Sequence, residues 1–70
     1  MTAAEAMKKA RWKAHGLGES DWRTEGNRVY PCADFQDIIL TALMSALREA
    51  GVKFEVTFST DDTYGYLEVQ

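Results

Sequence analysis

Residues 34–50 read DFQDIILTALMSALREA, and residues 52–70 read VKFEVTFSTDDTYGYLEVQ. The first stretch repeats apolar side chains at the three- and four-residue spacing of an α-helix, and the second alternates apolar and polar side chains as a β-strand does. Gly51 stands between them, where glycine commonly ends a helix. We therefore expect a helix over Asp34–Ala50 that leads directly into a β-hairpin.

The alternation in the hairpin assigns each strand residue to a side of the sheet. The side chains expected to face the core are Val52, Phe54, Val56, Phe58, Leu67 and Val69. Those expected on the open face are Lys53, Glu55, Thr57, Tyr64, Tyr66 and Glu68. Residues 59–63 are turn formers. Their acids, Asp61 and Asp62, lack the spacing of an EF-hand loop and are interpreted as a solvated turn.

The expected helix is apolar around an unusually wide arc. A helix that packs on one sheet needs an apolar stripe of about 100°, and this stripe is roughly twice as wide. Its centre comprises Phe35, Ile39, Leu43, Ala46 and Ala50, with Ile38 and Ala42 on one flank and Leu40, Met44 and Leu47 on the other. Either the N-terminal helix covers the Leu40, Met44 and Leu47 flank, or a partner does. Met44 suits an adaptable contact.

An N-terminal helix is expected over Thr2–His15. Thr2 and Glu5 have the spacing of a capping box, alanines follow, and Gly16 is the expected left-handed cap. One face of this helix carries small apolar residues, namely Ala3, Ala6, Met7, Ala10 and Ala14. Such a face buries little area but allows close packing.

Trp12 lies on another side of this helix, with Lys8, Lys9 and Lys13 around it. Two interpretations compete. In the first, the indole folds over the helix edge and covers the core, with lysine stems beside it. In the second, Trp12 is an exposed contact for a protein or a stacked base.

The middle of the chain is consistent with a short hairpin. Residues 21–24 and 28–30 have strand preferences, and residues 25–27 (Glu-Gly-Asn) form a turn signal between them. A loop that ends in a single strand is the alternative. Pro31 ends the strand, and Ala33 or Asp34 is expected to cap the helix that follows. The element order is therefore α-β-β-α-β-β or α-β-α-β-β.

No residue set indicates catalysis. Cys32 and His15 are the only residues of their kinds, and no motif links them, so we interpret Cys32 as an inert, buried or half-buried thiol. A structural metal usually has four ligands, more than these two supply. We expect no enzyme activity, no cofactor and no metal.

Length and composition favour one small α+β domain over residues 1–70, with two helices on an antiparallel sheet of three to four strands. Apolar content of 46% and charged content of 27% are ordinary for a globular chain. No apolar run approaches the roughly 18 residues of a membrane span. The formal net charge is −3, with six Lys or Arg against four acids in residues 1–28 and two against seven afterwards. This acidity argues against nucleic acid as the default ligand.

The leading hypothesis is a protein-interaction module that docks on a basic surface of a larger, possibly nucleic-acid-handling, complex and inhibits or modulates it. The expected partner-binding residues are Trp12, Leu40, Met44, Leu47, Asp61, Asp62, Tyr64, Tyr66 and Glu68. In type, though not in any motif, the chain is similar to phage and mobile-element accessory proteins such as anti-CRISPR proteins. With its single cysteine, this implies a cytoplasmic location, in the host if the chain is phage-encoded.

Two alternatives belong to other classes. The first is a nucleic-acid-binding regulator in which Lys8, Lys9, Arg11 and Lys13 contact phosphates while Trp12 stacks on a base. The second is a structural homo-oligomer held together through Leu40, Met44 and Leu47.

Overall fold

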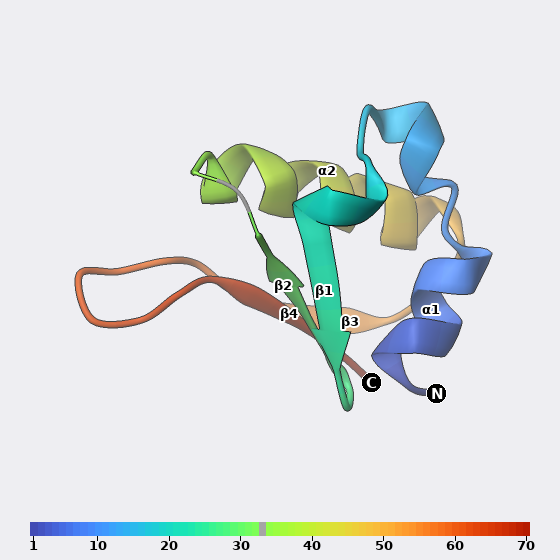
Figure 1. Ribbon diagram of the computed structural model, residues 1–70. Coiled ribbons are helices and arrows are strands. Elements are labelled where there is room, and N and C mark those ends of the chain that lie inside the picture. Colours follow the sequence, from blue (N-terminus) through green and yellow to red (C-terminus); the bar gives the residue numbers. More distant parts are fainter. Residues whose placement is uncertain (33) are drawn as a thin grey trace.

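The computed structural model describes residues 1–32 and 34–70 and shows an α+β domain (Figure 1). Two α-helices and four strands follow the order α-β-β-α-β-β, the fuller of the two predicted orders. The elements are α1 (Ala3–Lys9), the 3-10 helices η1 (Trp12–His15) and η2 (Glu19–Asp21), β1 (Trp22–Glu25), β2 (Arg28–Pro31), α2 (Gln36–Glu49), β3 (Phe54–Thr57) and β4 (Tyr66–Val69).

The four strands form one antiparallel sheet in the order β1-β2-β4-β3. The predicted hairpin in the middle of the chain is confirmed, with Trp22 opposite Pro31 and Glu25 opposite Arg28. Gly26 closes its turn at a φ of 59°, a conformation that favours glycine. After β2, helix α2 carries the chain past β4 to the far edge of the sheet, where β3 begins.

Helix α2 lies across one face of the sheet, and α1 stands beside it near both chain termini (Figure 1). The core between these layers is almost entirely aliphatic. Its largest fully buried side chains are Met7, Val29, Leu40, Leu43, Leu47 and Leu67. The predicted inward direction of Leu67 and Val69 is confirmed, because both are buried. No described helix has both the length and the apolar character to cross a membrane.

The N-terminal helix is shorter than predicted. Its capping box is present, with Thr2 Oγ1 accepting from the Glu5 N–H at 3.2 Å. The Thr2 N–H in turn holds the pKa of the exposed Glu5 carboxyl below its usual value. The helix ends at Lys9, and its C-cap residue Ala10 has an extended ψ of 138°. The 3-10 helix η1 follows after Arg11. Gly16 has the predicted left-handed conformation, but it ends η1.

This break has a packing reason. It lets η1 pack against α2 while the Trp12 ring meets Trp22 edge-on, with centroids 5.5 Å apart. Ala14 is exposed as a result, whereas Ala3, Ala6, Met7 and Ala10 are buried as expected. One continuous helix to His15 is therefore wrong, because tertiary contacts outweigh alanine's helix preference.

The second helix also begins later than predicted. Its first residue is Gln36 and its N-cap position is Phe35, whose side chain makes no capping hydrogen bond. Asp34 is therefore not the cap, and Ala33, the other predicted cap, lies outside the described residues. Phe58 was expected in the core but is 52% exposed, because β3 ends one residue before it.

Candidate protein-binding surface

The loop between β3 and β4 contacts the start of α2. Ser59 Oγ donates a hydrogen bond of 3.0 Å to Asp37 Oδ1, which joins the loop to the first turn of the helix. Gly65, at the other end of the loop, is buried, and a β-carbon there would collide with Leu40 Cδ1 and lie 3.0 Å from the Ser59 N–H nitrogen. Glycine thus lets the loop approach the core closely, and residues far apart in sequence become neighbours.

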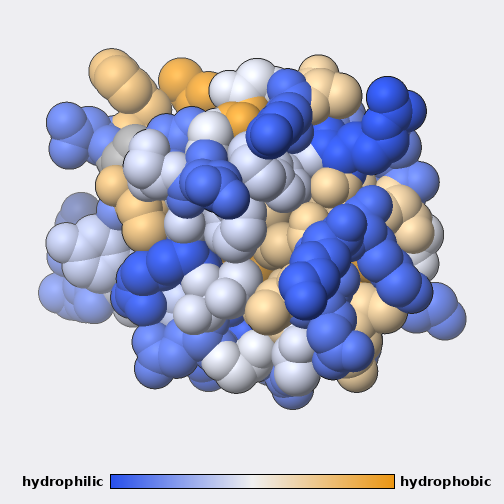
Figure 2. Space-filling model, turned by 45° about the vertical axis from the view of Figure 1, so that its right-hand side comes forward, coloured by the Kyte–Doolittle hydropathy of each residue, from blue (hydrophilic) through white to orange (hydrophobic). Residues whose placement is uncertain are grey.

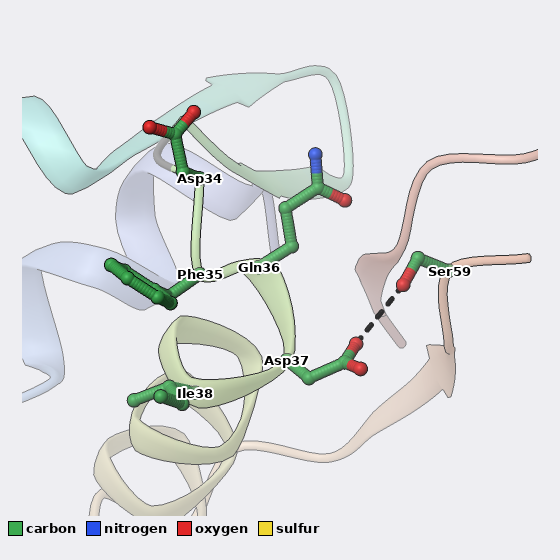
Figure 3. Close-up of a pocket in the computed structure, with 6 residues that line it drawn as sticks. All are labelled: Asp34, Phe35, Gln36, Asp37, Ile38 and Ser59. Atoms are coloured by element: carbon green, nitrogen blue, oxygen red, sulfur yellow. Dashed lines mark hydrogen bonds between the residues drawn. The ribbon is translucent and has the colours of Figure 1, made fainter.

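Two adjoining hollows mark this junction. Asp34, Phe35, Gln36, Asp37, Ile38 and Ser59 line the first, which has a volume of about 340 Å³ (Figure 3). Gln36 and the loop residues 59–64 line the second. Because both hollows share Gln36 and Ser59, they form one continuous surface. In Figure 3, Asp37 points toward Ser59, while Phe35 and Ile38 project from the opposite side of the helix start.

Large apolar side chains are unusually exposed on this surface. Phe35 is 70% exposed, Ile38 68% and Tyr64 74%. Single exposed apolar residues are normal, but here Phe35 and Ile38 line the first hollow and Tyr64 lines the second. We define the α2-end surface as the apolar and acidic residues of this region, namely Asp34, Phe35, Asp37, Ile38, Asp61, Asp62 and Tyr64.

The α2-end surface is also acidic. Its four aspartates are all exposed, and no Lys or Arg is among the residues that line the two hollows. The partial positive charge at the start of α2 favours a carboxylate in its first turn, where Asp37 lies. The surface therefore combines exposed carboxylates with exposed apolar side chains, and Arg23 borders it in a third hollow that Asp34 and Tyr64 also line. Carboxylates beside apolar side chains suit contact with a basic protein surface.

The helix flank that was expected to bind a partner lies mostly inside the molecule. Leu40 and Leu47 are fully buried in the core, and Met44 is half-buried against it. The sheet and η1 occupy that side of α2, so these leucines cannot contact a second molecule without unfolding. The wide apolar arc instead emerges on the other flank, through Ile38 and half-buried Ala42.

Tyr66 and Glu68 do lie on the open face of the sheet, but their side chains contact neighbouring strands. Arg28 Nε donates to Glu68 Oε1 at 3.0 Å, Arg28 Nη1 donates to the Tyr30 hydroxyl at 3.3 Å, and its guanidinium lies 4.3 Å from the Tyr66 ring centroid. The hydrogen bond to Tyr30 and, to a smaller extent, the one to Glu68 raise the pKa of Arg28 above its usual range. These residues stabilise the sheet between them.

Trp12 is half-buried, as the first interpretation expected. Its ring packs on Trp22, and Lys13 Nζ lies 5.5 Å from its centroid. Lys8, Lys9, Arg11 and Lys13 are all exposed, and residues 10–14 line a hollow beside the indole. Figure 2 brings this side of the molecule forward and shows hydrophilic side chains bordering a smaller apolar patch. The basic residues predicted for nucleic-acid contact are therefore all accessible, and two of them, Arg11 and Lys13, line one hollow with Trp12.

Cys32 is exposed, which corrects the expectation of a buried or half-buried thiol. It follows the last residue of β2, and its N–H donates to the Asp21 carbonyl at 2.9 Å. Within the described part of the chain, no three His, Cys, Asp or Glu side chains converge as a metal site requires.

Sequence reasoning found Asp61, Asp62 and Tyr64 of the α2-end surface and missed Asp34, Phe35, Asp37 and Ile38. Of the missed residues, only Ile38 had a signal, the width of the apolar arc on the helix, but that width left open whether a flank would stay uncovered, and the periodicity was the same for both flanks. Phe35 was predicted at the centre of the arc and is exposed instead, and the acids Asp34 and Asp37 carried no such signal.

The described residues form a small α+β domain whose α2-end surface combines exposed aspartates with exposed apolar side chains. No protein-family model, no curated protein and no solved structure matches the chain.

Proposed function

We propose that this chain is a protein-interaction module that docks through its α2-end surface on a basic surface of a larger protein or complex, and inhibits or modulates it. The observation that carries the proposal is the position of Phe35. A 70% exposed aromatic stands where helices prefer Ser, Thr, Asp or Asn, and it makes no capping bond. Departures from local preference with no structural gain are typical of functional sites.

The neighbouring residues fit the same role. Phe35, Ile38 and Tyr64 supply apolar area of the kind that anchors interfaces, and the aspartates around them supply charge that guides encounter and orientation. A nucleic-acid-handling complex carries extended basic surfaces, which makes it the partner class that this chemistry suits best. Occupying such a surface would exclude the natural ligand without any catalysis, in the manner of the anti-defence proteins of phages. The proposal places the module in the cytoplasm.

The experiment is a capture from lysate of the source organism or its host, with nuclease added. Three baits are compared: the wild-type chain, a Phe35→Ser/Ile38→Ser variant, and a Lys8→Ser/Lys9→Ser variant that alters an equally exposed surface on α1. The proposal expects one protein complex to be retained by the wild type and the α1 variant and lost with the α2-end variant. Retention by all three baits would place the contact elsewhere and contradict the proposal.

A single substitution at Phe35 should separate binding from stability. Phe35→Ser introduces a favoured capping hydroxyl and removes an exposed ring, so we expect the free energy of unfolding to rise by about 0.5–1 kcal/mol. The same substitution should weaken binding to the purified partner by about tenfold or more, since exposed aromatic anchors concentrate binding energy. Thermal melting and titration calorimetry measure the two effects. A loss of stability together with unchanged affinity would show that Phe35 serves the fold.

The basic surface around Trp12 favours a second candidate function, the binding of nucleic acid. Arg11 and Lys13 line a hollow with the half-buried Trp12, and Lys8 and Lys9 are exposed on the preceding helix, which supports charge contacts to phosphates with the indole beside them. If this surface binds single-stranded nucleic acid, Lys8→Ala/Lys9→Ala should lower the slope of log affinity against log salt concentration by about 1–2. Fluorescence anisotropy with a labelled oligonucleotide measures that slope. A salt response that is flat in the wild type would dismiss this candidate.

A further inference from the structure

The two edge strands of the sheet differ in whether another segment of the chain packs against them. At the β1 edge, Gly26 O, in the turn after the strand, accepts a hydrogen bond of 3.0 Å from the Ala3 N–H, and α1 packs against the strand. Strand β3 forms the other edge, and among the described strands it pairs with β4 alone. Edge strands are normally protected by prolines, bulges or covering segments, because their free backbone groups invite another strand. Residues 54–57 (Phe-Glu-Val-Thr) contain no proline.

The backbone direction at this edge follows from one hydrogen bond. The Gln70 N–H donates to the Lys53 carbonyl at 3.0 Å, so Lys53 directs its backbone groups toward β4. Because direction alternates along an antiparallel strand, Glu55 and Thr57 do the same, while Phe54 and Val56 present their N–H and C=O groups to the free edge. Their side chains are only half-buried, although they face the helix layer. The guanidinium carbon of Arg48, in α2, lies 5.8 Å from the centroid of the Phe54 ring.

Within the part of one chain that the structure describes, the charged side chains of Lys53 and Glu55 lack opposite-charged partners, which they would find between two copies. Glu55 lies directly opposite Glu68, a like-charged pair, and Arg28 already pairs with Glu68. Neither Lys53 nor Glu55 takes part in an ion pair among the described residues. If two copies meet antiparallel with Phe54 opposite Phe54, each Lys53 stands opposite the other copy's Glu55. In this register Phe54 pairs with Phe54 through backbone groups that face the free edge, and Lys53 and Glu55 form the neighbouring non-hydrogen-bonded pairs, in which side chains lie close together.

We propose that a second copy of this chain pairs along the β3 edge, with Phe54 at the two-fold axis and two reciprocal contacts between Lys53 and Glu55. The pairing extends the sheet across both chains and brings two half-buried Phe54 rings together on the helix side. The neighbouring register, with Glu55 opposite Glu55, is disfavoured by charge. This interface is separate from the α2-end surface, and it replaces the dimer through Leu40, Met44 and Leu47 that the apolar pattern suggested.

Charge exchange tests the pairing. In sedimentation equilibrium, the wild type should form a concentration-dependent dimer. Lys53→Glu and Glu55→Lys should each raise the dissociation constant about tenfold or more, because both attractive pairs become repulsive. The double variant K53E/E55K should dimerise like the wild type. A mixture of the two single variants should form a heterodimer, since every facing pair is then opposite in sign.

The same set of variants includes a control for effects on folding. Glu55→Lys turns the like-charged pair with Glu68 into an opposite-charged one, so the thermal stability of the single chain should not fall. Loss of the dimer in this variant therefore reports on the interface. A wild type that stays monomeric at millimolar concentration overturns the proposal. So does a dimer that is indifferent to both single substitutions, or a mixture that forms no heterodimer.

Discussion

Leu40→Ala should leave most molecules unfolded at room temperature. Leu40 is fully buried between α2 and the sheet, and its Cδ1 occupies the space into which a side chain at Gly65 would project. Removing such a side chain costs roughly 2–5 kcal/mol, through lost burial and the cavity left behind. A domain of this size has only about 3–5 kcal/mol of core stabilisation to lose. Urea denaturation followed by circular dichroism measures the change.

Ile38→Ala is the matched control for this substitution. It removes the same number of carbon atoms from the same helix, but Ile38 is 68% exposed, so we expect a change in unfolding free energy within about 0.5 kcal/mol. The pair separates a core role from a contact role, because Ile38→Ala should weaken partner binding. Equal costs for the two substitutions would mean that α2 presents a different side to the sheet.

Reversing charge at Asp61 and Asp62 should remove most of the affinity for the partner. Each single change to Lys should weaken binding about tenfold, and both together about a hundredfold, because close charge pairs across interfaces couple by about 1.5 kcal/mol or more. Both acids are exposed, and the loop is held by Ser59 and Gly65, so the fold should be unaffected. The loss should appear largely in the association rate, and should shrink as salt is added. Surface plasmon resonance at two salt concentrations measures both the association rate and the dependence of the loss on salt.

Glu49→Lys provides the control for net charge. It makes the same change in charge as either single reversal, but at the opposite end of α2, roughly 20 Å away along the helix axis. Binding should stay within about twofold of the wild type. If Glu49→Lys weakened binding as much as Asp61→Lys, overall charge and not the α2-end surface would govern the interaction.

Local pattern predicted the secondary structure of this chain well where its signals were strong. The capping box at Thr2 and Glu5, the turn at Gly26 and the inward Leu67 and Val69 are all present. The N-terminal helix was over-extended, because alanine-rich sequence tolerates a helix to His15 while packing favours a break at Ala10. The register of residues within elements was easier to predict than the ends of those elements.

The candidate surface was only partly predictable, for a different reason. Asp61 and Asp62 stand in the predicted polar turn and are exposed wherever that turn lies. Tyr64 was predicted on the open face of the second strand, but it lies in the loop because β4 begins only at Tyr66. Phe35 and Ile38 have the character of core residues, and their exposure depends on where the helix starts and which flank faces the sheet. The pattern of residues along the sequence does not determine where the helix starts or which flank faces the sheet.

By itself, the sequence determined the α+β class and the helix followed by a hairpin in residues 34–70, because helix and strand periodicity, caps and turns are local properties of the chain. It also determined that the helix after Pro31 has more apolar surface than one sheet can cover. It left open whether the middle of the chain forms one strand or two. Only the tertiary structure decided that Leu40 and Leu47 are inside while Phe35 and Ile38 are outside, and that the acidic loop lies beside them. The physical reason is that burial depends on what packs against a side chain, and those neighbours come from distant parts of the chain.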